Sequence, residues 1–182
     1  AVGKSALLSS IALQALAQGK RVLYVSLEME PREIISRMMA SLANVSAAKM
    51  EAHELTEEEN DRVVEAYGVF NGDALHISQK AVTPALVRKV ALKVKAKGGL
   101  DMVCIDYLQL MRSHTKQAQN SREREIAEIS GGLKGLAKEL NLPIIALAQL
   151  NRGPENRPGK NKGVPMMSDL RESGAIEQDA DM

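Results

Sequence analysis

The chain has 182 residues, of which 45% are hydrophobic and 26% are charged, and its formal net charge at pH 7 is +1. These values exclude a disordered or fibrous chain and predict a single globular domain, residues 1–182, that is large enough to bury a core. The net charge is too small to attract nucleic acid through the field of the whole protein, so any contact with DNA must come from local basic loops.

The sequence indicates neither a membrane segment nor a redox framework. The longest apolar runs, such as Val22–Val25 and Leu142–Ala148, are too short to cross a bilayer, and no secretory leader pattern begins the chain. The single cysteine, Cys104, lies within an apolar run and is expected to be a small buried hydrophobe. We therefore expect a cytoplasmic protein without disulfides or a metal cluster.

Short apolar strands alternate with amphipathic helices along the chain. Helices are expected at Ser5–Gln18 with Gly19 as its cap, from Pro31 with Ile34, Ile35, Met38, Met39 and Leu42 facing inward, from Thr56 to about Tyr67, from Thr83 to Gly99, and at Arg122–Leu140. Strands are expected at Arg21–Leu27, Ala74–Ser78, Asp101–Asp106 and Leu142–Gln149. Because the strands are continuously apolar, we predict an α/β fold with a mostly parallel sheet and helices on both faces.

The last expected helix carries three glycines. Gly131, Gly132 and Gly135 each cost roughly 1 kcal/mol relative to alanine at an exposed helical position. We therefore expect this helix to be less stable than a helix without them.

The first residues match the end of a phosphate-binding pattern. Gly3-Lys4-Ser5 is the last part of G-x-x-x-x-G-K-[ST] and lies where the first helix begins, so the chain looks cut at this end. Free N–H groups and the helix dipole favour an anion there, Lys4 can reach the β- and γ-phosphates, and the Ser5 hydroxyl can hold Mg²⁺. A tripeptide match is common, so an ordinary loop-to-helix junction is the alternative interpretation.

Three polar residues follow three of the expected strands. Glu28 and Asp106 come at the ends of apolar runs, and Gln149 ends another. In a parallel sheet these residues emerge at one edge, where Asp106 can hold Mg²⁺ directly or through water, Glu28 can orient or deprotonate the attacking water, and Gln149 can sense the γ-phosphate. Each residue taken alone is equally explained as a polar strand terminus.

Two polar stretches, 113–121 and 151–165, follow apolar strands at the edge where ligands bind in open α/β sheets. The second stretch carries four cations against Glu155, namely Arg152, Arg157, Lys160 and Lys162. This local excess predicts contact with a phosphate backbone, and a solvated loop is the alternative.

Longer strings carry a family resemblance over nearly the whole chain. They are SLEM at 26–29, IDYLQLM at 105–111, LAQLNR at 147–152 and SDLRESGAIEQDAD at 168–181. These strings resemble the motor domain of bacterial DnaB-type replicative DNA helicases. The resemblance implies a RecA-like P-loop ATPase that uses ATP and Mg²⁺, assembles as a homo-hexameric ring, moves 5′ to 3′ on single-stranded DNA and works with primase and a helicase loader.

The resemblance also implies a role for individual positions. Gly3, Lys4 and Ser5 match the phosphate loop, Glu28 the catalytic carboxylate, Asp106 the Mg²⁺-linked aspartate and Gln149 the residue that links the γ-phosphate to the DNA loops. Arg171, Glu172 and Gly174 match the channel segment that follows the DNA backbone. An arginine and a glycine N–H can hold phosphates without reading bases. An aromatic content of 2% agrees with this, since stacking platforms are scarce.

The chain departs from the family pattern at its ends. The first half of the phosphate loop and the segment that carries the arginine finger have no counterpart within residues 1–182. We therefore expect a single RecA-like domain that is incomplete at both ends. A recombination or repair ATPase of the same superfamily, and a non-hydrolysing module that binds DNA or a partner, are the alternatives to the helicase motor.

Overall fold

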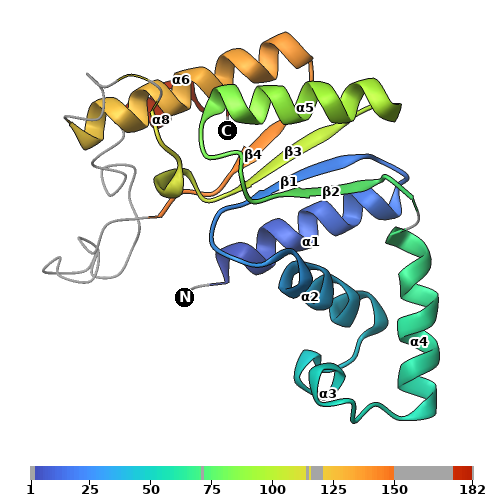
Figure 1. Cartoon of the computed structure of the whole chain (residues 1–182). Helices are drawn as coiled ribbons and strands as arrows, with labels where there is room; N and C mark the ends of the chain where they lie inside the picture. The colour runs from blue at the N-terminus through green and yellow to red at the C-terminus, as the bar shows by residue number, and fades with distance from the viewer. Residues whose placement is uncertain (1–2, 71, 114, 116–120, 150–173, 182) are drawn as a thin grey trace, which may run out of the picture.

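The computed structural model describes residues 3–70, 72–113, 115, 121–149 and 174–181. Its centre is a sheet of four parallel strands in the order β2-β1-β3-β4 (Figure 1). The strands are β1 (Val22–Ser26), β2 (Leu75–Ser78), β3 (Met102–Asp106) and β4 (Ile144–Ala146). The α-helices are α1 (Lys4–Ala17), α2 (Pro31–Ala43), α3 (Ala47–Ala52), α4 (Glu57–Tyr67), α5 (Pro84–Gly98), α6 (Arg122–Leu140) and α8 (Gly174–Asp179).

The two faces of the sheet are covered by different helices, as Figure 1 shows. Helices α5 and α6 lie on one face, where Leu23, Val25, Val103 and Ile105 point into a core that the two helices close. Helices α1 and α2 lie on the other face and pack against alternate strand residues. This arrangement confirms the predicted α/β fold with a parallel sheet and helices on both faces.

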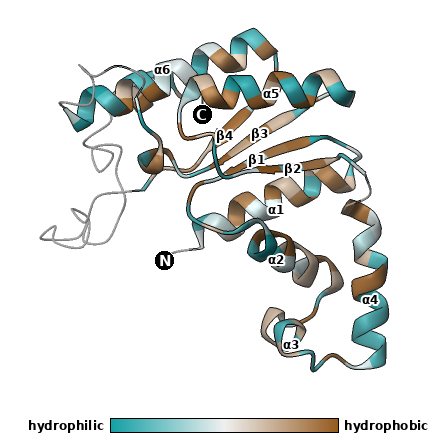
Figure 2. Cartoon of the chain, viewed as in Figure 1, coloured by the Kyte–Doolittle hydropathy of each residue, from teal (hydrophilic) through white to brown (hydrophobic). Residues whose placement is uncertain are grey.

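The two central strands are apolar and more deeply buried than the two edge strands. Every residue of β1 and β3 is buried, and both strands are coloured as hydrophobic along most of their length in Figure 2. Strands β2 and β4 lie at the edges of the described sheet and are only partly buried. The centre of the sheet therefore lies at β1 and β3.

Local signals set the helix ends. Gly19 follows α1 with a φ of 73°, a left-handed conformation that glycine adopts readily. Thr56 and Glu59 form the predicted capping box at the start of α4, and the hydroxyl of Thr83 accepts a hydrogen bond at the start of α5. Helix α6 runs without interruption through its three glycines. Among the described helices, none is long and apolar enough to cross a membrane.

Three predictions about the elements are corrected by the structure. The last strand was expected to span Leu142–Gln149, but β4 covers only Ile144–Ala146, which pair with residues 103–105 of β3 before the chain after β3 turns into a 3₁₀ turn at Leu108–Leu110. Ile35 was expected to face inward, but it is 37% exposed on the side of α2 that faces α3. Helix α3 was not predicted; it is a short helix whose first turn is capped by Ser46.

Candidate functional site

The residue that precedes helix α1 is a glycine in a left-handed conformation. Gly3 has a φ of 70° and precedes the first helical residue, Lys4. Within the described part of the chain, no atom would lie within 4 Å of an added Cβ, so the backbone conformation, and not crowding, favours glycine here. The first N–H groups of α1 have no acceptor within the helix, which makes this end suitable for an anion.

Lys4 lies against the end of β3. Its Nζ is 5.3 Å from the centre of the Tyr107 ring, a distance typical of a cation–π contact. Tyr107 directly follows Asp106, the last residue of β3. The contact therefore brings the start of α1 and the end of a central strand together, as predicted from the sequence.

Asp106 has an unsatisfied oxygen at this place. The residue is 2% exposed, and within the part of the chain that the structure describes its Oδ2 is buried without a hydrogen-bond partner. A buried carboxylate oxygen without a partner is costly unless a ligand or a bound water satisfies it. The oxygen chemistry of Asp106 and of the half-buried Ser5, in the first turn of α1, fits Mg²⁺, which prefers carboxylate, hydroxyl, phosphate and water ligands.

Glu28 is exposed in the loop after β1, and Ser26 shapes that loop. The buried Ser26 hydroxyl donates to the carbonyl of Met29 at 2.7 Å and accepts from its N–H at 3.2 Å. These two bonds close a tight turn with Glu28 inside it. Because Ser26 is level with Asp106 in the β1–β3 register, Glu28 emerges at the same edge of the sheet as Asp106.

Gln149 is exposed beyond the end of β4, and the amide of Gln109 pairs with its backbone. The N–H of Gln149 donates to Gln109 Oε1 at 3.0 Å, and Gln109 Nε2 donates to the carbonyl of Gln149 at 3.1 Å. Gln109 lies in a single 3₁₀ turn, η2 (Leu108–Leu110), which follows β3. The structure thus holds Gln149 beside the chain that leaves β3.

The predicted DNA-contacting residues are only partly described. Gly174 begins α8, where it is exposed, and α8 packs against α6. An ion pair between Lys134 of α6 and Asp181 holds the residues that follow α8. The other predicted residues of this group lie outside the described residues; they are Arg152, Arg157, Lys160, Lys162, Arg171 and Glu172.

Three residues of the site had no predicted role. Tyr107, Gln109 and Ser26 all lie within the strings that carried the family resemblance. A polar residue before Glu28 in an apolar strand, and an amide between two leucines in LQL, were available signals. Their partners, however, are set by the tertiary fold, since Gln109 and Gln149 are 40 positions apart.

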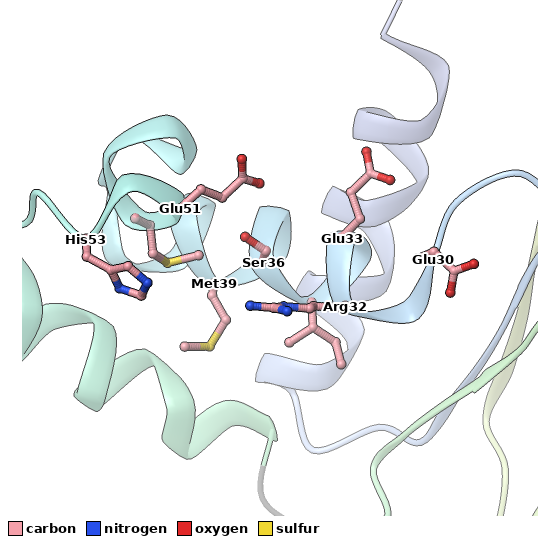
Figure 3. A pocket seen from close by; sticks show the side chains of 9 residues that line it. Glu30, Arg32, Glu33, Ser36, Met39, Glu51 and His53 are labelled. Carbon is pink, nitrogen blue, oxygen red and sulfur yellow. The ribbon is translucent and has the colours of Figure 1, made fainter.

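A separate hollow of about 540 Å³ lies between α2 and α3 (Figure 3). Its walls include Met39 and Met50, with Arg32, Glu51 and His53 at its rim in Figure 3. Among the described residues, no predicted site residue lines this hollow. It is therefore distinct from the edge of the sheet where Lys4 contacts Tyr107.

Comparison with known proteins shows that the chain is similar to one domain of replicative DNA helicases. The family model described as "DnaB-like helicase C terminal domain" matches residues 1–182. The chain is 39% identical over its whole length to the replicative DNA helicase DnaC of Bacillus subtilis, and 46% identical over 92% of its length to the replicative DNA helicase DnaB of Haemophilus influenzae. It spans 39% and 36% of these two proteins, respectively.

Solved structures agree in fold. One solved structure, described as an ATPase domain, superposes with a TM-score of 0.88 at 35% identity, over 98% of this chain and 63% of that one. A DnaB-like replicative helicase, studied with its interactions with primase, gives a TM-score of 0.86 at 34% identity, over 98% of this chain and 42% of that one. These matches do not favour the alternatives of a recombination ATPase or a non-hydrolysing module. The chain belongs to the DnaB-like helicase C-terminal domain family and has the RecA-like fold of helicase ATPase domains.

Proposed function

We propose that this chain is the ATP-driven motor of a replicative DNA helicase, which couples hydrolysis of Mg-ATP to 5′ to 3′ movement on single-stranded DNA and to duplex unwinding. The observation that carries the proposal is the contact of Lys4, at the start of α1, with Tyr107, which directly follows Asp106. The Oδ2 of Asp106 is buried and has no hydrogen-bond partner among the described residues. A phosphate-binding helix end beside a buried carboxylate is the arrangement that a P-loop ATPase needs.

The residues at the edge of the sheet divide the chemistry among them. The N–H groups that follow Gly3 hold the phosphates, and Lys4 exchanges its contact with Tyr107 for the γ-phosphate and stabilises its charge. Ser5 and Asp106 would hold Mg²⁺, Asp106 directly or through a water. When bound, this ion neutralises the charge on the phosphate oxygens.

Glu28 and Gln149 act on the reacting end of the nucleotide. The exposed carboxylate of Glu28, held in the Ser26–Met29 turn, accepts a proton from the attacking water. The amide of Gln149 contacts the γ-phosphate and transmits its presence to the segment that follows. Both side chains are exposed in the structure and so are accessible to a nucleotide.

The contacts with DNA come from the segments after Gln149. Arg171, Glu172 and the N–H of Gly174 follow the backbone of the single strand, with the basic residues Arg152, Arg157, Lys160 and Lys162 as further contacts. The motor works as a homo-hexamer in the bacterial cytoplasm, with primase and a helicase loader as partners. These assignments rest on the family and on the chemistry of the residues.

Strand displacement from a forked DNA tests the proposal. The protein to use is this chain extended at both ends to the length of its curated relatives, with Lys4→Ala as the inactive control. We expect unwinding that needs ATP, Mg²⁺ and a single-stranded 5′ tail on the fork, and that Lys4→Ala abolishes. Unwinding that persists in Lys4→Ala, or its absence in the wild-type protein with all components present, would contradict the proposal.

A further inference from the structure

The backbone hydrogen bonds between β3 and β4 continue beyond the end of β4. The N–H of Leu147 donates to the carbonyl of Ile105 at 2.9 Å, and the N–H of Leu108 donates to the carbonyl of Leu147 at 2.9 Å. Beyond this point the chain after β3 enters the 3₁₀ turn η2, whose backbone carbonyls and N–H groups point elsewhere. A regular ladder therefore ends two residues before Gln149.

The side chain of Gln109 supplies the next rung. A primary amide has one carbonyl and an N–H donor, the same pair that a peptide group presents, and Gln109 uses both on the backbone of Gln149. The two bonds, at 3.0 and 3.1 Å, are of ordinary length for amide pairs. Both atoms of the Gln109 amide are thereby used on one residue.

Gln109 is itself held by the start of α6. Arg122 Nη2 donates to the main-chain carbonyl of Gln109 at 2.7 Å, and Arg122 forms an ion pair with Glu125. The other oxygen of Glu125 accepts the N–H of Ser113 at 3.2 Å. Two charged residues at the start of α6 therefore hold η2 at Gln109 and the chain that follows it at Ser113.

From this arrangement we propose that Gln109 is a positioning residue for the motor, which fixes the backbone of Gln149 so that its side chain reaches the γ-phosphate. The inference rests on the proposed role of Gln149. Arg122 acts one step further out, by fixing Gln109. The side-chain amide of the half-buried Gln109 makes both of its described hydrogen bonds with the backbone of Gln149, so the role we assign to Gln109 is to position that residue.

The test uses Gln109→Met, which keeps the length of the side chain and removes both hydrogen bonds. Gln14→Met makes the same change at an exposed position of α1 and is the matched control. We expect Gln109→Met to lower kcat for DNA-stimulated ATP hydrolysis by about tenfold, which is what losing two net hydrogen bonds predicts. The Kd for ADP, which lacks the γ-phosphate, should change by less than about twofold.

Amide hydrogen exchange tests the hydrogen bonds between Gln109 and the Gln149 backbone without ATP hydrolysis. In the nucleotide-free protein, the peptide that contains Leu147 and Gln149 should exchange faster in Gln109→Met than in wild type or Gln14→Met. Unchanged exchange in this peptide would overturn the proposal, because the bond to Gln149 would then not hold the backbone.

A double-mutant cycle separates this proposal from the proposed function. If Gln109 acts through Gln149, adding Gln109→Met to Gln149→Ala should lower kcat by less than about twofold further. A full tenfold loss in both backgrounds, or an unchanged kcat in Gln109→Met while Gln149→Ala impairs hydrolysis, would overturn the positioning role alone. Failure of the wild-type protein to hydrolyse ATP would overturn the proposed function itself.

Discussion

The central strands and the edge strand β4 hold their polar ends by different means. β1 and β3 are buried along their whole length and have a neighbouring strand on each side, so the sheet itself places the ends that lead to Glu28 and Asp106. β4 pairs only with β3 in the described sheet and is half-buried, and Gln149 lies three residues beyond it. Beyond β4, the side chain of Gln109 supplies backbone hydrogen bonds of the kind that neighbouring strands supply at the centre of the sheet.

This difference has a consequence for function. A rigid centre suits the roles proposed for Asp106 and Glu28, which are to hold a metal and a water in fixed positions. An edge secured by a few hydrogen bonds can change its position at a small cost, which suits a residue that reports whether a γ-phosphate is present. The proposed roles of Glu28 and Asp106 therefore fall at the ends of the central strands, and the proposed role of Gln149 falls beyond an edge strand, where Gln109 holds its backbone.

The largest expected effect is the difference in the free energy of unfolding between a substitution in central strand β3 and one in edge strand β4. Ile105→Ala, in β3, removes a fully buried side chain and should lower the free energy of unfolding by about 4 kcal/mol, whereas Ile144→Ala, in half-buried β4, should lower it by about 1.5 kcal/mol. Urea unfolding of both variants beside the wild type measures the two values. Equal losses would show that β4 is as firmly packed as β3.

High pH should weaken the central strands in particular. Burial raises the pKa of Cys104, on β3, from 9.0 to about 12, and burial likewise raises the pKa of Tyr24, on β1, from 10.0 to about 12. The unfolded chain loses these protons at lower pH than the folded protein does. Below about pH 9 these two groups do not lower the free energy of unfolding. As pH rises from there toward 12, each group lowers the free energy of unfolding by up to about 1.4 kcal/mol per pH unit.

Two variants assign this pH dependence to the central strands. Cys104→Ala should flatten the fall from about pH 9, and Tyr24→Phe should flatten it from about pH 10, as measured by urea unfolding across this range. Tyr67→Phe removes the same hydroxyl from an exposed position of α4 and serves as a control. An unchanged slope in both core variants would refute the assignment.

The turn that carries Glu28 should respond more moderately. Ser26→Ala removes the hydroxyl that serves both the N–H and the carbonyl of Met29, which should lower kcat for ATP hydrolysis about tenfold and the free energy of unfolding by about 1–2 kcal/mol. The Kd for ADP should stay close to that of the wild type. Ser41→Ala, at an exposed position of α2, is the matched control. A wild-type kcat in Ser26→Ala would mean that the turn does not orient Glu28.

The smallest effect concerns α6, the helix that contacts both β4 and α5. Gly135→Ala should raise the free energy of unfolding by about 0.5–1 kcal/mol, because an added Cβ would meet no atom within 4 Å. Gly132→Ala should gain less or lose stability, since its Cβ would lie 3.1 Å from Pro84 Cβ and 3.2 Å from Pro84 Cγ. Thermal unfolding of the two variants compares them, and a larger gain at Gly132 would contradict the close approach of α5.

Much of the fold could be predicted because its strongest signals are local. Continuous apolar strands, the capping box at Thr56 and the cap at Gly19 each act within a few residues, and the structure confirms them. The strand order and the short length of β4 depend on which strands pair, which no local pattern encodes. Ile35 was placed inward by its spacing, but it lines the hollow between α2 and α3 and remains partly exposed.

The residues of the candidate site that belong to local motifs could also be predicted from the sequence. Gly3, Lys4 and Asp106 were expected at one edge because their motifs and strand ends are readable in the chain, and the structure brings Lys4 beside the residue that follows Asp106. The role of Gln109 depends on a hydrogen bond to a residue 40 positions away, so it needed the folded structure. The catalytic roles of Gly3, Lys4 and Asp106 are still predictions.

DNA-stimulated ATP hydrolysis by the extended protein, measured for wild type and Glu28→Gln together with ATP binding, tests the central claim most directly. Removing a general base typically lowers the rate by about 10²–10⁴-fold, while the neutral amide leaves phosphate binding intact. The account predicts strong hydrolysis by the wild type, and a loss of that size in Glu28→Gln with ATP still bound. Equal rates in the two proteins would contradict the role of Glu28, and no hydrolysis in either would contradict the motor itself.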